Sequence, residues 1–213
     1  MIEGLIGKKK GMTELFLETG EVVPTTIIEA GPCYVVDKKT EQRDGYNSVK
    51  IGFNEIKPQR SNKAMSGIFK KAGLQPLGIL KEFKVLNNEY DKYNAGDSIT
   101  VDIFAEGDFL DVSSISKGKG FSGAMQRHGF SGQRDSHGGM AHRRVGSIGQ
   151  ASFPAKVWKG QKMPGHYGAK KFTIHGLKVV KVDIENNLVL IKGSVPGPNG
   201  SHIFLKHTVK GRA

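Results

Sequence analysis

The sequence has 213 residues, 37% of them hydrophobic, so it can form a core of useful size and is too apolar for a wholly disordered chain. Its 32 Lys and Arg outnumber 20 Asp and Glu, and the formal charge of +12 indicates a polyanion, a membrane surface or an acidic partner. The single cysteine, Cys33, excludes an intramolecular disulfide framework, a Cys₂His₂ zinc finger and an iron–sulfur cluster held by this chain's own thiolates.

The longest apolar runs, such as residues 188–191, are far too short to cross a bilayer, so we expect no membrane association. Residues 1–7 lack the basic flank and the long apolar stretch of a signal peptide. These features predict a soluble, cytoplasmic protein.

Short segments rich in β-branched and aromatic residues predict β-strands on both sides of a glycine-rich middle. Turn sequences separate several of these segments. Short strands at a spacing of about ten residues favour a closed or nearly closed antiparallel barrel over an α/β sheet. We therefore predict a mainly β fold, with strands at 12–17, 22–28, 34–36, 46–53, 83–86, 98–104, 177–183, 188–191 and 202–205.

One helix is predicted in this β-rich region. Asn62 can cap a segment over 63–71 that places Ile68 and Phe69 on one face, and Gly73 ends it. We place this helix in a small insertion at about 58–80.

Residues 117–170, which we call the extension, differ from the rest of the chain. They contain ten Lys or Arg, one acid (Asp135), twelve glycines, four of the seven histidines and no leucine. Such a stretch cannot bury enough apolar area to offset the entropy lost on ordering. We therefore expect the extension to take a fixed shape only against a partner, and residues 1–116 and 171–213 to form the globular body.

Two motifs in the extension suggest enzymes. Residues 118–123 match the dinucleotide fingerprint G-x-G-x-x-G, but Gly129 and Gly132 interrupt the helix that must follow, and the acid expected about twenty residues later is missing. The histidines could suggest a metal-dependent enzyme, but no Cys or Glu lies among them. A nucleophile elbow is also absent. We expect no enzyme activity, no catalytic residue, no metal and no cofactor.

The cations of the extension alternate with aromatic residues. Arginine binds phosphates through two donors at once, aromatic rings stack on unpaired bases, and glycine lets the main chain approach closely. No helix-turn-helix, zinc finger or basic zipper is present, which favours RNA over DNA. A free-standing basic nucleic-acid-binding module is the alternative. The predicted RNA contacts are Lys117, Lys119, Arg127, His128, Arg134, His137, His142, Arg143, Arg144, Lys156, Trp158, Lys159, Lys162 and His166.

The whole chain resembles the bacterial form of large-subunit ribosomal protein three, of the universal ribosomal protein L3 family. Residues 4–13 are similar to that family's N-terminal segment, and residues 159–166 to a second motif of its arm. From the N-terminal segment we add Lys8, Lys9 and Lys10 to the predicted RNA contacts. The family's signature is matched in order and spacing by Phe104, Asp111, Ser114, Ser116, Gly118-Lys-Gly120, Gly123 and Arg127.

The resemblance implies a translation-protein-type β-barrel and a structural role in the large (50S) ribosomal subunit. It implies direct binding of the large-subunit (23S-type) rRNA near its 3′ end, an early role in assembly, and an arm directed toward the peptidyl-transferase region. Large-subunit proteins fourteen and nineteen are the implied neighbours. It also implies that Gln150 is N-methylated by a glutamine methyltransferase, with an unmodified, packed glutamine as the alternative.

Overall fold

The computed structural model describes residues 2–85 and 89–209. The chain divides into two compact units. One contains the described residues up to Ile115 and from Lys171 onward, and the other is Ser116–Lys170. No helix in the described part of the chain is both long and apolar enough to span a membrane.

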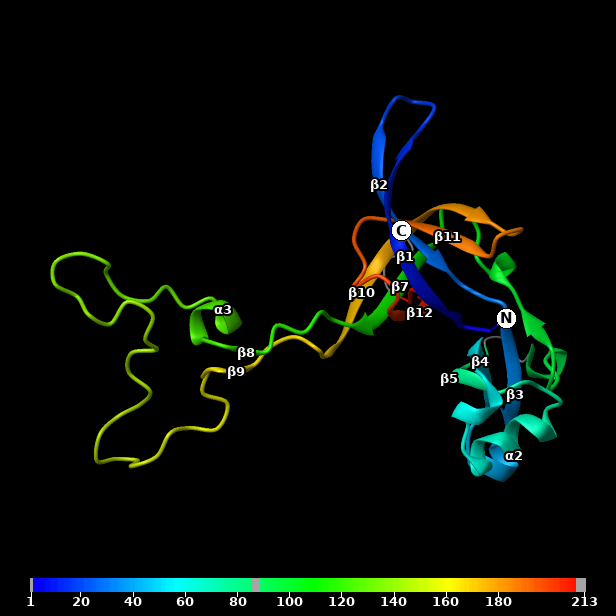
Figure 1. The fold of residues 1–213 in the computed structure, drawn as a ribbon, viewed down its shortest axis with the longest axis horizontal. Coiled ribbons are helices and arrows are strands. Elements are labelled where there is room, and N and C mark those ends of the chain that lie inside the picture. Colours follow the sequence, from blue (N-terminus) through cyan, green and yellow to red (C-terminus); the bar gives the residue numbers. More distant parts are fainter. Residues whose placement is uncertain (1, 86–88, 210–213) are drawn as a thin grey trace. The chain divides into compact units, whose positions relative to one another are not determined.

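The first unit contains a closed six-stranded barrel in which every neighbouring pair of strands is antiparallel (Figure 1). Alternate residues of its strands are buried, as in Leu188–Lys192, because successive side chains point to opposite faces of a sheet. The mainly β fold and the antiparallel barrel are therefore confirmed. The strands, in barrel order, are β1 (Gly4–Phe16), β12 (His202–His207), β7 (Phe109–Ile115), β10 (Lys171–Asp183), β11 (Leu188–Lys192) and β2 (Val22–Glu29).

The segment between β2 and β7 does not join the barrel, contrary to our expectation of a single barrel with a small insertion. It forms a separate four-stranded sheet in the order β5 (Leu77–Phe83), β4 (Ser48–Glu55), β3 (Cys33–Lys39) and β6 (Ser98–Ile99). The predicted strands at 34–36 and 46–53 overlap β3 and β4, whereas most of β5 was not predicted. Composition also does not identify a strand's pairing partner. The segment predicted as one strand over 98–104 is β6 followed by the 3₁₀ turn η3 (Val101–Ile103).

The predicted helix is confirmed as α2 (Lys63–Lys71), and the side-chain oxygen of Asn62 accepts a hydrogen bond from the amide of Met65 at 2.8 Å. The end of the proposed insertion was wrong, because residues 77–80 already belong to β5. The predicted strand over 83–86 was wrong in its bounds: only Phe83 belongs to β5, Val85 forms an isolated bridge with Ile2, and residue 86 lies outside the described residues. The shorter helical elements of this unit are α1 (Glu41–Asp44), η1 (Pro58–Arg60) and η2 (Glu89–Lys92).

One continuous hydrophobic core joins the barrel and the second sheet. Leu5, Ile51, Val112 and Leu205 are fully buried within it. Cys33 belongs to the same core and is fully buried. Burial raises the pKa of its thiol to about 12, although the thiol donates to the carbonyl oxygen of Ile6.

The second unit has little regular structure: β8 (Phe121–Ser122), α3 (Ala124–His128) and β9 (Gly165–His166). A helix does follow residues 118–123, which we had not expected, but Gly129 ends it after five residues by adopting a φ of 73°. The two strands pair only with each other, and antiparallel. The parallel βαβ unit of a dinucleotide site is therefore absent from residues 116–170, all of which are described.

Candidate nucleic-acid interface

The two ends of the extension are joined by a short ladder. Phe121 pairs with His166, and Ser122 with Gly165. The amide of Lys119 donates to the carbonyl oxygen of Tyr167 at 2.9 Å, and the amide of Tyr167 donates to that of Gly120 at 2.9 Å. These bonds fix the ends of a loop that contains most of the predicted RNA contacts.

Arg127 and His128 strengthen this closure from α3. Nη1 of Arg127 donates to the carbonyl oxygen of Met163 at 2.7 Å, and Nε2 of His128 lies 3.1 Å from the same oxygen. Both side chains are half-buried. They therefore hold the two legs of the extension together, and Arg127 keeps its remaining guanidinium donors for another acceptor.

The other cations of the extension are exposed and lack carboxylate partners. Within residues 116–170, the one ion-pair geometry is that of His142 with Asp135, at 3.2 Å. None of the ten Lys and Arg pairs with a carboxylate there. The exposed cations are Lys117, Lys119, Arg134, Arg143, Arg144, Lys156, Lys159, Lys162 and Lys170.

The cations of the body contrast with these. Lys10 pairs with Glu29 at 2.8 Å, and Lys206 pairs with Glu3. Arg43 pairs with two carboxylates of the body. The body thus supplies carboxylate partners to several of its cations, whereas among the described residues the Lys and Arg of the extension have none.

Arg143 and Arg144 line a cavity of about 590 Å³ in the extension. Gly123 and Ala124, at the start of α3, also line it. Small residues let another backbone approach closely, and the two guanidinium groups offer donors to phosphate oxygens. The cavity is therefore suited to a segment of sugar–phosphate backbone.

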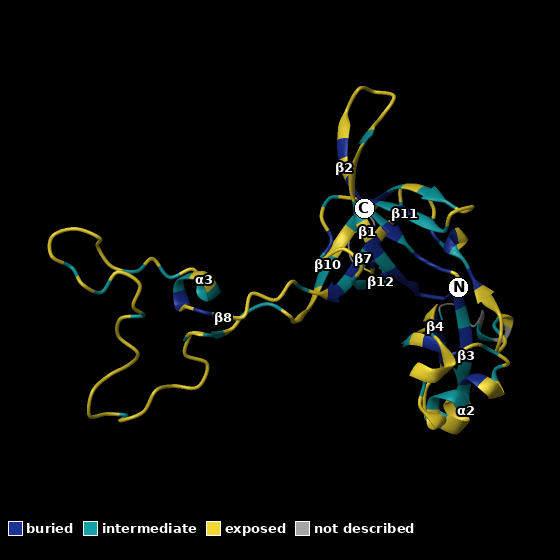
Figure 2. Cartoon of the chain, viewed as in Figure 1, coloured by how far each residue is buried: buried dark blue, intermediate teal, exposed yellow. Residues whose placement is uncertain are grey.

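Three aromatic residues of the extension, Phe121, Phe153 and Trp158, are exposed. Figure 2 colours most of this unit as exposed. Phe153 is 88% exposed and Trp158 58% exposed. Nζ of Lys156 lies 4.9 Å from the centre of the Trp158 ring, and Nζ of Lys119 lies 4.7 Å from that of Tyr167. A ring flanked by a cation is suited to stack on a base beside its phosphate.

The remaining predicted contacts of the extension, His137 and His166, are exposed, as is Gln150. In the described residues, no three His, Cys, Asp or Glu side chains come close enough together to hold a metal ion. The histidines are thus distributed along the loop and do not converge on one point.

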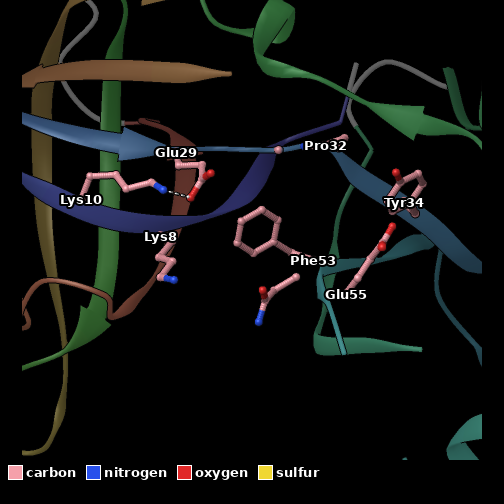
Figure 3. Close-up of a pocket in the computed structure, with 9 residues that line it drawn as sticks. Lys8, Lys10, Glu29, Pro32, Tyr34, Phe53 and Glu55 are labelled. Carbon is pink, nitrogen blue, oxygen red and sulfur yellow. Dashed lines mark ion pairs between the residues drawn. The ribbon is translucent and has the colours of Figure 1, made fainter. Parts of the chain in front are cut away.

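The three predicted lysines of the body have different environments. Lys8 and Lys10 line a pocket of about 350 Å³ with Tyr34 and Glu55, and Figure 3 shows the ion pair of Lys10 with Glu29 beside it. Lys9 differs from our expectation. It is only 7% exposed, and its ammonium donates to the carbonyl oxygens of Val195 and Gly197, so it supports the barrel and is unavailable to a phosphate.

Sequence reasoning missed a lysine-lined groove on the body. Lys81, Lys84, Lys171 and Lys206 surround a hollow of about 440 Å³. Its acids, Glu3 and Glu82, are neutralised within the body by Lys206 and Lys39. Lys81 and Lys84 are close in the sequence, but Lys171 and Lys206 come from distant segments, so no local pattern predicts the groove.

A β-barrel body that carries a glycine-rich extension with uncompensated cations is the architecture of a basic ribosomal protein. The sequence model of the family described as Ribosomal protein L3 matches residues 79–187. Large ribosomal subunit protein uL3 of Thermosipho africanus is 52% identical over 207 residues, covering 97% of this chain and 98% of its own.

Two further relatives agree over the full length. Large ribosomal subunit protein uL3 of Carboxydothermus hydrogenoformans is 50% identical over 212 residues, covering 100% of both chains. That of Corynebacterium jeikeium is 49% identical over 213 residues, covering 100% of this chain and 97% of its own. The chain belongs to the ribosomal protein L3 family. It is a protein of the large ribosomal subunit, located in the cytoplasmic ribosome.

Proposed function

We propose that the extension, residues 117–170, binds large-subunit rRNA directly and fixes the arrangement of neighbouring RNA strands. The observation that supports this most strongly is that none of its ten Lys and Arg has a carboxylate partner among the described residues, while several cations of the body have one. An RNA backbone supplies the missing negative charge, and binding releases the counterions condensed around it.

The body, residues 1–116 and 171–213, is the docking unit in this proposal. Its lysine groove binds a phosphate segment through Lys81, Lys84 and Lys171, none of which pairs with a carboxylate among the described residues. Lys8 adds a contact near the N-terminal strand. Two separated contact areas on one chain bring different RNA segments together, which fits a protein that acts early in assembly.

The finer assignments rest on the family. We infer binding near the 3′ end of the 23S-type rRNA, an extension directed toward the peptidyl-transferase region, and contact with large-subunit proteins fourteen and nineteen. Gln150 is the proposed N-methylglutamine. Its exposure, and the absence of a side-chain hydrogen bond to any described residue, leave its amide open to a methyltransferase before assembly. Mass spectrometry of the peptide that contains Gln150 tests this assignment.

A structural role without catalysis fits the chemistry of the described residues. The histidines are dispersed, and Cys33 is a buried thiol. A metal-dependent enzyme would bind zinc or iron stoichiometrically, which elemental analysis of the purified chain measures. A free-standing nucleic-acid-binding module would sediment apart from ribosomes in a sucrose gradient, whereas the proposed function requires sedimentation with the large subunit.

Replacing Arg143 and Arg144 together by Ala tests the function of the extension. Both side chains are exposed, so the melting temperature of the body should not change. Incorporation of the variant into large subunits, or peptidyl transfer by those subunits, should decrease. A lower melting temperature with normal assembly and activity would reverse the assignment.

A further inference from the structure

Strands β1 and β2 continue past the barrel as a two-stranded hairpin, seen in blue in Figure 1. The pairing of β1 with β12 involves residues 4–8, and that of β2 with β11 involves residues 25–29. Among the strands described, residues 12–24, which we call the hairpin tip, therefore take part only in the pairing of β1 with β2. The amide of Leu17 donates a hydrogen bond to the backbone carbonyl oxygen of Glu21 at 3.0 Å and closes the turn.

The hairpin tip is acidic in a strongly basic protein. It contains Glu14, Glu18 and Glu21 and no Lys or Arg, while the whole chain carries +12. Glu21 lies 3.8 Å from Lys192, whereas Glu14 and Glu18 have no ion-pair partner among the described residues. Like charges repel, so this segment is unsuited to contact an RNA backbone.

The hairpin tip also exposes apolar side chains. Phe16 is 76% exposed, and Met12, Leu17 and Val22 are exposed with it. An isolated two-stranded hairpin gains little stability from itself, and an apolar patch flanked by charge marks protein contact surfaces. Phe16 has no described neighbour that would bury it.

A groove beside the hairpin tip is likewise lined by both apolar and charged residues. Leu17 and Val23 line about 380 Å³ of space together with Val179 and Val180 of β10. Glu21 and Glu106 stand at its polar side, with Lys178 and Lys192. Apolar walls with charges of both signs resemble the surroundings of protein side chains in an interface more than those of a phosphate backbone.

We propose that the hairpin tip is the docking site for a Lys- and Arg-rich segment of another protein of the large subunit. Charge complementarity selects the partner: its cations pair with Glu14 and Glu18, and its apolar side chains cover Phe16 and fill the groove at Leu17. The body would then meet RNA through its lysine groove and a basic protein through the hairpin tip.

Photo-crosslinking within intact large subunits tests this. Phe16 is replaced in the full chain by the photoreactive analogue p-benzoylphenylalanine, which its exposed position tolerates. A second variant carries the analogue at Phe153, another exposed phenylalanine, in the extension. After irradiation, mass spectrometry identifies the crosslinked product.

The expected product from Phe16 is a peptide of another large-subunit protein with more Lys and Arg than Asp and Glu. Crosslinking to RNA, to an acidic peptide or to nothing overturns the proposal. Phe153 reports separately on the proposed function, because it should crosslink to rRNA. A protein product at Phe16 with no RNA product at Phe153 would retain this inference and reject RNA binding by the extension.

Charge reversal supplies a second readout. Combining Glu14→Lys and Glu18→Lys should lower the Phe16 crosslinking yield by about tenfold, since like charges then meet at the contact. The control is Glu41→Lys with Glu185→Lys, which makes the same change in net charge at exposed positions elsewhere on the body. Equal yields from the two charge-reversed variants would contradict the proposed pairing.

Discussion

Nη1 of Arg127 donates to the carbonyl oxygen of Met163 at 2.7 Å, and the two residues are 36 positions apart. This bond closes the extension across the ends of its loop. Replacing Arg127 by Ala should cost about 1 kcal/mol of local stability, because the side chain is half-buried and a partner carbonyl loses its donor. Amide hydrogen exchange over 121–128 and 163–167 should become about fivefold faster.

The control for this change is Arg134→Ala. Arg134 is exposed and its guanidinium makes no hydrogen bond to a described residue, so its loss should leave exchange in the extension unchanged. The melting temperature of the body should not move in either variant. Equal exchange rates in the two variants would show that the Arg127 bond does not hold the loop closed.

The lysine groove predicts a contribution of the body to RNA binding. Lys84→Gln combined with Lys171→Gln should weaken binding to large-subunit rRNA by about tenfold, because two cations facing the same hollow are lost. Lys178→Gln combined with Lys192→Gln removes the same charge beside the hairpin tip and should have a much smaller effect. Filter binding at fixed ionic strength measures both, and equal losses would mean that only net charge matters.

Because the pKa of His202 is lowered, we expect the body to lose stability in mild acid. Burial lowers its pKa below the ordinary value of 6.5, and the charge of Lys8 lowers it further. In mild acid the unfolded chain therefore binds a proton that the folded chain does not. The contribution of neutral His202 to the free energy of unfolding is complete above about pH 6.5 and is lost as the pH falls below it. Melting curves between about pH 7.5 and about pH 5.5 should show a smaller drop for His202→Gln than for the wild type.

Lys8→Met should also reduce that drop, because it removes the repulsion between the ammonium and the protonated ring. Its effect should be smaller than that of His202→Gln, since burial is the larger cause of the lowered pKa. Parallel pH profiles in the wild type and both variants would exclude His202 as the group responsible.

We expect the thiol of Cys33 to react only after the body unfolds. Its pKa of about 12, against an ordinary 9.0, leaves about a thousandfold less thiolate at neutral pH, and the side chain is fully buried. Alkylation by iodoacetamide should therefore be very slow in buffer and fast in denaturant. Rapid labelling of the native chain would contradict the described core.

The sequence allowed most of the strands, the capped helix and the antiparallel barrel to be predicted, because alternating apolar residues and turn residues are local signals. Strand β7 and most of β5 were missed. The division into a barrel and a separate sheet could not be predicted. Val35 and Val189 lie in similar apolar segments, yet one is in the sheet and the other in the barrel. Pairing partners depend on contacts between distant segments, which no local pattern encodes.

The candidate RNA interface was predictable where charge is concentrated along the chain, as at Arg143 and Arg144. It was not predictable where folding redirects a side chain. Lys9 lies between two lysines with the same local sequence, but the strand buries it, and only the structure shows that its ammonium binds carbonyl oxygens. Lys84 and Lys171 meet only after the body folds.

The salt dependence of rRNA affinity measures how many cations the RNA neutralises. If about eight cations contact phosphates, the plot of log affinity against log salt should have a slope of about −6. When Arg143, Arg144, Lys159 and Lys162 are all replaced by Ala, the slope should change from about −6 to about −3. A slope near zero in the wild type, or an unchanged slope in the variant, would contradict RNA binding by the cations of the extension.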